Sequence, residues 1–402
     1  MNVSSSKVPM SSLVMANVLY WVCAGVYSPF LSAYYARLGL DASQTGMLLA
    51  VTPLCAICVQ PLWSSLADRL GKRKAVGTLL CVAAAAASLL YYLANNFAGV
   101  LIATVAFSLF FSALLPLCDS LVIDLAAESS LDFSRIRMGG TIGYAVAVFA
   151  IGRLLDEAPQ IQFAIVSASL IVFALHLSRL SEPSVERGRK ALPDTQNVPP
   201  GGGARGALSI FTSREIVYVL AFALVSQSAI GFIGAFLGRY SVVLGGGQNL
   251  VGLLSAVSAM SEIPILLVST KLIERFGELS LLMLSGFMAA LRLLLVGTGI
   301  VPFMIAGQLL QSVSYMTVYY SCVTYIANHV RPGCEARGQS IFAVVQSGLS
   351  VVIANVAGGI ACDALGIQNS FYAFALLTVL VNTVVCGSYF VLCKRGPRAI
   401  PR

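Results

Sequence analysis

An acidic and a basic side chain stand out in this sequence because charged residues are rare in it. Only 10% of the 402 residues are charged, yet the stretch "DFSRIRMGGTIGY" at 132–144 carries two arginines and follows an apolar run that contains Asp119 and Asp124. A planar guanidinium beside a carboxylate can hold vicinal hydroxyl groups in a fixed direction. We expect Asp119 and Arg137 to bind a polar solute in this way, or else only to lock two helices together. Asp124 lies nearer the end of its run, and we expect it to be solvated.

Glu262 and Arg292 form a second candidate pair. They lie twelve and thirteen residues from the same end of two successive apolar runs. In adjacent antiparallel helices they would therefore share a depth of roughly 18–20 Å. A carboxylate held beside an arginine can take up or release a proton when either group moves. We predict that this pair couples proton movement to another event, with a permanent structural ion pair as the alternative.

Both pairs are expected to lie on membrane-spanning helices. The sequence is 58% hydrophobic with a mean hydropathy of +0.86, well above the usual composition of soluble domains. Apolar runs of about 20 residues recur, each long enough to cross the hydrocarbon layer, where only helices satisfy every backbone group in such a chain. We predict an all-α polytopic membrane protein with twelve transmembrane helices. The predicted spans are 10–36, 43–66, 75–94, 98–126, 136–154, 160–178, 214–238, 248–270, 279–299, 302–327, 339–361 and 369–392.

The basic residues predict the orientation. With twelve spans and both termini on one side, that side receives 21 of the 25 lysines and arginines. The other side receives Arg37, Arg153 and Arg239, and Arg292 lies within a span. The positive-inside rule then places both termini in the cytoplasm of a multi-pass protein of the cell (inner or plasma) membrane. The net charge of +8 reflects this asymmetry. No soluble basic domain is expected, so the predicted partners are the lipid bilayer and a small-molecule solute, without nucleic acid, for a monomeric protein.

A polar segment rich in proline and glycine divides the predicted spans into six and six. It covers residues 182–212, leaving an N-terminal six-helix bundle at 1–181 and a C-terminal six-helix bundle at 213–402. The two halves share a short repeat, "LADRLGKRK" and "LIERFGELS", each between the second and third spans of its half. Two similar bundles around a midplane cavity are typical of transporters with alternating access.

The "ADRLGKRK" stretch, together with twelve spans arranged six and six, resembles the loop signature of the major facilitator superfamily. Ser64 stands where that motif usually has glycine. The resemblance implies the major facilitator fold and a cytoplasmic latch that breaks as the inside opens. Ordinary topology-setting charges are the alternative. The predicted gating residues are Asp68, Arg69, Gly71, Glu274 and Arg275.

Within that superfamily, the sequence is most similar to lactose permease and the related oligosaccharide and nucleoside proton symporters. The stretch "GVYSPFLSAYY" resembles their first helix, and the arginines and glycines at 135–144 resemble the start of their fifth. Asp119 precedes Arg137 by eighteen residues, the separation of the sugar-binding acid and arginine in the permease. The resemblance implies that these two side chains hold hydroxyl groups, and that Tyr144 stacks on the solute in place of a tryptophan.

The departures from the permease lie in the second half of the chain. Glutamines or a serine replace its charged residues on helices 10 and 11, and only Arg292 and Glu262 remain of its charge network, so lactose specificity does not carry over. Polar and aromatic residues also recur at helical spacing on the first and tenth spans. The predicted solute-binding residues are Asp119, Arg137, Tyr144, Tyr27, Gln308, Gln311 and Gln346, and the predicted proton-coupling residues are Glu262 and Arg292.

The sequence therefore predicts a secondary active transporter that imports a small polar organic solute (a sugar, nucleoside or aromatic acid) with protons. No cofactor is expected, and the proton gradient is the expected energy source. Two alternatives stay open, namely proton-antiport efflux of drug-like compounds and a non-transporting receptor or scaffold on the same fold. An enzyme is not expected, because the sequence shows no nucleophile, metal-ligand set or phosphate-binding loop.

The charge asymmetry predicts the location of the C-terminal tail. A reporter enzyme that is active only outside the cytoplasm, fused after Arg402, should give no activity in intact cells, because both termini are predicted to be cytoplasmic. A cytoplasm-active reporter at the same site serves as the control. Strong activity of the first reporter would contradict the predicted number of spans or their orientation.

Overall fold

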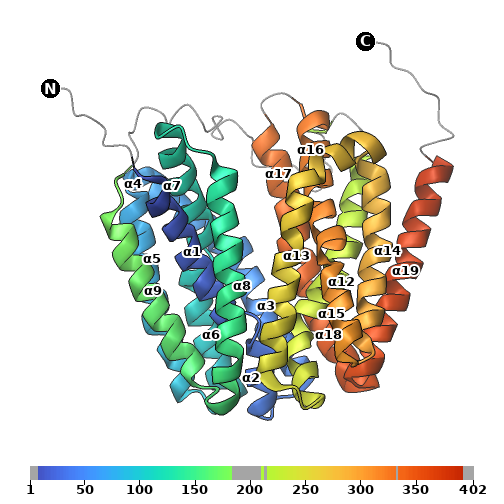
Figure 1. Ribbon diagram of the computed structural model, residues 1–402, viewed down its shortest axis with the longest axis horizontal. Coiled ribbons are helices and arrows are strands. Elements are labelled where there is room, and N and C mark those ends of the chain that lie inside the picture. Colours follow the sequence, from blue (N-terminus) through green and yellow to red (C-terminus); the bar gives the residue numbers. More distant parts are fainter. Residues whose placement is uncertain (1–7, 183–209, 212–214, 332–333, 393–402) are drawn as a thin grey trace. The chain divides into compact units, whose positions relative to one another are not determined.

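The computed structural model describes residues 8–182, 210–211, 215–331 and 334–392. These residues form helices joined by short turns, with one isolated antiparallel bridge between Phe211 and Val330 (Figure 1). The predicted all-α class is therefore confirmed for the described chain. The predicted linker at 182–212 falls almost wholly outside the described ranges.

The helices before the linker follow the predicted spans closely, and several spans consist of two successive helices. They are α1 (Met10–Tyr27), α2 (Leu31–Arg37), α3 (Ala42–Cys58), α4 (Gln60–Leu70), α5 (Arg73–Ser88) with the 3₁₀ turn η1 (Leu89–Leu93), α6 (Phe97–Phe111), α7 (Leu114–Glu128), α8 (Phe133–Glu157) and α9 (Ile161–Arg179).

The helices after the linker include two π-helical turns. They are α12 (Ile216–Val243), α13 (Gly247–Phe276), α14 (Glu278–Gly297), α15 (Val301–Leu309), the π turn η3 (Ser312–Met316), α16 (Thr317–His329), α17 (Glu335–Ala343), the π turn η4 (Val344–Leu349), α18 (Ser350–Leu365) and α19 (Ile367–Leu392).

Ten helical segments of the described chain are long and apolar enough to cross a membrane. They coincide with ten of the twelve predicted spans. The predicted span at 248–270 lies within α13, and the predicted span at 302–327 is divided among α15, η3 and α16. This architecture is that of the predicted polytopic helical membrane protein.

The described chain groups into two compact units whose limits differ from the predicted halves. The first unit joins all described residues up to 182 with Gly234–Met260 and Asn355–Asp363. The second contains the remaining described residues, including Ser261–Ala354. The ends of α12 and α13 that adjoin the turn at 244–246, and most of α18, thus pack with the N-terminal helices.

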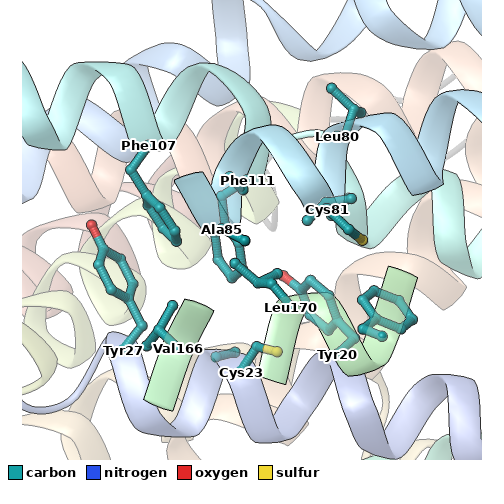
Figure 2. Close-up of a cluster of buried hydrophobic side chains, with 14 of the residues drawn as sticks. Tyr20, Cys23, Tyr27, Leu80, Cys81, Ala85, Phe107, Phe111, Val166 and Leu170 are labelled. Atoms are coloured by element: carbon teal, nitrogen blue, oxygen red, sulfur yellow. The ribbon is translucent and has the colours of Figure 1, made fainter. Parts of the chain in front are cut away.

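The core of the first unit lies along one face of α1. Figure 2 shows Tyr20, Cys23 and Tyr27 of this helix pointing toward side chains of α5, α6 and α9. The Tyr20 ring stacks on Phe111 with the ring centres 5.8 Å apart. Between membrane helices such close packing supplies attraction that lipid tails do not replace. The partners drawn include Leu80, Cys81, Ala85, Phe107, Val166 and Leu170, all of them buried.

The glycines that follow Arg137 face the opposite side of α1. A Cβ atom built on Gly139 would lie 2.6 Å from Cγ1 of Val14, and one built on Gly143 would lie 2.9 Å from Cγ1 of Val18. Real Cβ atoms do not approach so closely, so α8 can contact α1 in this way only with glycine at these positions. The apolar run after the two arginines is therefore a helix-packing surface.

Two glycines of the repeated motif have positive φ angles, which residues with a side chain rarely adopt. Gly71 follows the last residue of α4 with φ of 61°, and Gly277 precedes α14 with φ of 74°. A side chain would strain either backbone. The repeat thus places glycine at a positive φ angle in both halves, but the two turns differ, because ψ is 24° at Gly71 and 154° at Gly277.

The α1–α8 contact leads to a prediction about stability. Gly139→Val should lower the melting temperature of the detergent-purified protein, because overpacking a close contact costs about 1–3 kcal/mol. Gly387→Val in α19 is the matched control, since a Cβ atom there would meet no atom within 4 Å. Equal melting temperatures for the two variants would contradict the close approach.

Candidate functional site

Asp119 and Arg137 form the ion pair that the sequence predicts. Asp119 lies on α7 and Arg137 near the start of α8, and Nη1 of the arginine donates to Oδ2 of the carboxylate at 3.0 Å. The aspartate side chain is 24% exposed and the arginine side chain 39% exposed. This bond uses one of the five N–H donors of the guanidinium, so others can reach a solute.

Trp21 completes this pair, and the sequence reasoning missed it. The guanidinium carbon of Arg137 lies 4.9 Å from the centre of the Trp21 ring, within the range of a cation–π contact. Tyr144, the predicted stacking ring, meets the edge of Trp21 instead, with ring centres 6.1 Å apart. Gly140 makes this possible, because a Cβ atom at that position would collide with Trp21. Trp21 lies one helical turn after Asn17, a polar residue of the predicted stripe, and that spacing could have identified it.

Buried acceptor atoms surround the ion pair. Asn17 is 1% exposed and lies beside the carboxylate of Asp119. Its own Oδ1 and Oδ1 of Asp119 are buried without a hydrogen-bond partner within the protein. Buried polar atoms normally have partners. A solute that offers hydroxyl or amine hydrogens could supply them here.

The second unit holds a larger polar network around Arg292 of α14. Its Nη2 donates to Oε1 of Gln308 at 2.6 Å, and its Nη1 donates to Oε1 of Gln311. The other end of that amide, Nε2 of Gln311, donates to Oε1 of Glu262 at 3.0 Å. Gln311 therefore bridges the two residues predicted as the proton-coupling pair. The network lies in the membrane-spanning region, where Arg292 is only 4% exposed.

Unused donor atoms accompany this network. Nε2 of Gln308 and Nε2 of Gln227 are buried without a hydrogen-bond partner within the protein. Gln311 directly precedes the π turn η3, whose wider winding changes the direction of the side chains next to it. The second unit thus offers amide donors to a bound molecule, whereas the first offers carboxylate and amide acceptors.

The other two predicted solute-binding residues are Tyr27 and Gln346. Tyr27 is 2% exposed, and its hydroxyl hydrogen-bonds that of Tyr91 at 2.9 Å inside the core of the first unit. Gln346 lies in the π turn η4 and is 9% exposed. In the described chain no hydrogen bond joins Gln346 to Gln308 or Gln311. Contact of either residue with solute stays a prediction.

The predicted latch contains an ion-pair network that corrects one expectation. Arg73 lies 2.9 Å from Asp68 and 2.6 Å from Asp124. Asp124 is therefore not the solvated helix-end charge expected from its position, because the tertiary fold brings α5 against α7. Arg69 lies in the last turn of α4, and in the second half the guanidinium of Arg275 lies 5.4 Å from the ring centre of Phe276.

Metal chemistry finds no support in the described residues. They contain no group of three or more histidine, cysteine, aspartate or glutamate side chains that could hold a metal ion. The arrangement offers instead two charged polar clusters, one in each unit, with hydrogen-bonding atoms left over. Such clusters can bind a polar molecule and can exchange a proton.

The chain is similar in sequence and in structure to known membrane transporters. The sequence model described as "MFS_1 like family" matches residues 11–373. The maltose permease of Geobacillus stearothermophilus is 27% identical over 374 residues, which cover 90% of each chain. The "Probable 3-phenylpropionic acid transporter" of Escherichia coli (strain K12) is 23% identical, covering 91% of this chain and 94% of that one. The crystal structure of the nucleoside transporter NupG matches with a TM-score of 0.80 at 15% identity, covering 94% and 98% of the two chains.

Proposed function

This chain belongs to the MFS_1-like family of membrane transporters, and from that premise we propose that it imports a small polar organic solute together with protons. It is a multi-pass secondary transporter of small solutes and not an enzyme. The direction of transport, the coupling ion and the solute class are the parts that we propose. A sugar, a nucleoside and an aromatic acid are the candidate solutes.

The observation that carries the proposal is the Asp119–Arg137 pair with its surroundings. A carboxylate and a guanidinium inside a membrane helix bundle are costly unless they pair or bind, and here the pair leaves both donors and acceptors unused. Hydroxyl groups of a solute can accept from Arg137 and donate to Asp119 or Asn17 at the same time. Trp21 beside them adds an aromatic surface for the apolar face of such a solute.

Proton coupling is proposed for the network around Glu262. Glu262 lies on a predicted membrane span and accepts a hydrogen bond from an amide that also binds Arg292. When Gln311 turns away, for example to bind a solute, Glu262 loses a donor that favours its charged form. Protonation of the carboxylate then becomes more favourable. Pro264, two residues later, interrupts the hydrogen bonding of α13 and would allow the helix to flex.

Alternating access is proposed from the repeat. The motif turns at Gly71 and Gly277 and the ion pairs of Arg73 occur at the predicted cytoplasmic ends of their helices. Contacts of this kind can break and re-form as the two bundles rock. In this scheme Asp68, Arg69, Glu274 and Arg275 help to close the cytoplasmic side.

The role of Arg137 in binding predicts the effect of a conservative change. Arg137→Lys should weaken solute binding roughly thirtyfold, because about 2 kcal/mol is lost when charge-assisted hydrogen bonds of the guanidinium are not replaced by an ammonium. Binding would be measured by thermal-shift titration with sugars, nucleosides and aromatic acids. Arg135→Lys is the matched control, since Arg135 is 75% exposed in its side chain. Unchanged binding by a well-folded Arg137→Lys protein would leave the pair merely structural.

The proposed function as a whole is tested in liposomes. The wild-type protein should accumulate a solute identified by the binding screen when a pH gradient is imposed. Glu262→Gln, which resembles the protonated carboxylate, should still exchange labelled solute between the two sides but lose accumulation, because it cannot release a proton. Glu278→Gln, at the start of α14, is the control.

Three outcomes would contradict the proposal. Accumulation by Glu262→Gln equal to that of the wild type would exclude Glu262 as the coupling site. Movement of the solute in the direction opposite to proton flow would indicate antiport efflux. Binding without any flux by the wild-type protein would indicate a receptor.

A further inference from the structure

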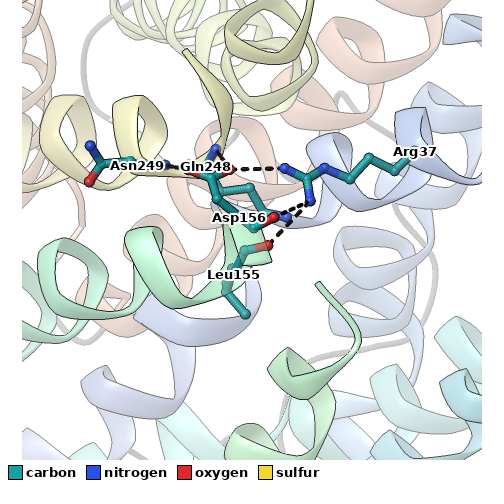
Figure 3. Close-up of polar contacts among 5 residues, drawn as sticks. All are labelled: Arg37, Leu155, Asp156, Gln248 and Asn249. Atoms are coloured by element: carbon teal, nitrogen blue, oxygen red, sulfur yellow. Dashed lines mark hydrogen bonds and ion pairs between the residues drawn. The ribbon is translucent and has the colours of Figure 1, made fainter. Parts of the chain in front are cut away.

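Asp156 binds the first turn of a helix from the other half of the chain. It lies at the end of α8, and its carboxylate accepts hydrogen bonds from the backbone N–H groups of Gln248 at 2.6 Å and Asn249 at 2.9 Å (Figure 3). Both N–H groups belong to the N-terminal turn of α13. Arg37 of α2 holds the same carboxylate at 2.9 Å and also donates to the backbone oxygen of Leu155.

Asp363 makes the reciprocal contact. It lies near the end of α18, and its carboxylate accepts hydrogen bonds from the backbone N–H groups of Ala42 at 2.9 Å and Ser43 at 2.8 Å, and from the Ser43 hydroxyl. Ala42 and Ser43 begin α3. A carboxylate of the second half thus caps a helix of the first half, and Asp156 does the converse. All these residues belong to the first compact unit.

An arginine also lies beside each cap, although the two arginines make different contacts. Arg239 of α12 donates to the backbone oxygen of Leu40 at 2.7 Å, just before α3. It follows Arg37 by 202 residues in the sequence, and Asp363 follows Asp156 by 207. These separations are close to the 206 residues between Gly71 and Gly277 of the repeated motif, so the two caps occupy corresponding positions in the two halves. Arg37 and Arg239 are also two of the three basic residues predicted to be extracytoplasmic.

Glycines let the capped helices approach closely enough for these bonds. A Cβ atom on Gly152 of α8 would lie 2.7 Å from the backbone oxygen of Gln248, and one on Gly252 of α13 would lie 2.6 Å from that of Val148. At the other contact, a Cβ atom on Gly359 of α18 would lie 2.5 Å from the backbone oxygen of Ala42. In both contacts the backbones of two helices touch directly, and one carboxylate forms hydrogen bonds across each contact.

We propose that the Asp156 and Asp363 caps are the two halves of one gate, which closes the extracytoplasmic end of the transporter and opens when both caps break together. The inference rests on the proposed alternating access. A carboxylate at a helix N-terminus binds the unsatisfied N–H groups and the positive end of the helix dipole. Water satisfies the same groups once the helices separate. The Asp156 side chain is already 30% exposed, so this exchange needs little rearrangement.

If the two caps open together, breaking one of them should affect both helices, which two independent helix caps would not do. Asp363→Asn weakens the cap on α3 alone, yet it should speed amide hydrogen exchange at the start of α3 and also at the start of α13, because both caps open together. The expected increase is about two- to thirtyfold, the range for loss of a helix cap. Asp156→Asn should have the same double effect. Exchange would be followed by mass spectrometry on the full-length protein in lipid nanodiscs.

Asp41→Ala is the matched control, because alanine removes the side-chain cap whereas asparagine would keep it. Asp41 is the N-cap of the same helix α3 and accepts from the backbone N–H of Gln44 at 2.6 Å, but it belongs to the same half of the chain as α3. It should therefore speed exchange at the start of α3 only. Unchanged exchange in α9 would show that each variant is folded.

The outcome that overturns the gate is an effect of Asp363→Asn confined to α3, together with an effect of Asp156→Asn confined to α13. Two independent helix caps would then explain the contacts. The measurement needs no solute and no flux. A double effect in a protein that transports nothing would leave the gate in place while the transport proposal fails.

Discussion

A charged side chain inside a membrane-spanning helix is stable only beside a partner, and the polar interior of this protein follows from that requirement. The first unit satisfies it by direct contact between Asp119 and Arg137. The second unit inserts the amide of Gln311 between Arg292 and Glu262. The two arrangements differ in what they can do. A direct pair keeps its charges through small movements, whereas an amide bridge ties the environment of the carboxylate to the orientation of one uncharged side chain.

Close helix packing supports the first of these arrangements. The glycines of α8 allow α1 to lie so near that Trp21 reaches the guanidinium of Arg137. A larger residue at Gly140 would push the ring away and would also crowd Asn17. The glycine-bearing stretch after the arginines thus serves packing and the polar cluster at once. The aromatic ring beside the arginine comes from α1, whereas the sequence predicted one on α8.

Features that depend on depth in the membrane could be predicted from the sequence, and features that depend on rotation could not. The rise of a helix is constant, so counting residues from the span ends was enough to predict that Glu262 and Arg292 lie at one depth, and Gln311 joins them in the structure. Trp21 was missed because the direction of a side chain around a helix depends on tertiary packing. The π turns next to Gln311 and within residues 344–349 shift that direction further and leave no clear sequence signal. Asp124 was misjudged because its partner Arg73 is 51 residues away along the chain.

Water can replace the contacts at the helix ends, but it cannot readily replace those in the membrane interior. At the ends, Arg73 with Asp68 and the carboxylates of Asp156 and Asp363 lie where water can take over each lost bond, and partly exposed ion pairs contribute only about 0–1 kcal/mol. In the interior, no such replacement is at hand for Arg292, which is 4% exposed. An interior network can therefore rearrange only if a solute or a proton supplies the missing partner. Contacts at the ends can therefore break without a ligand, whereas the proposed coupling needs the interior network to rearrange only when a solute or a proton binds.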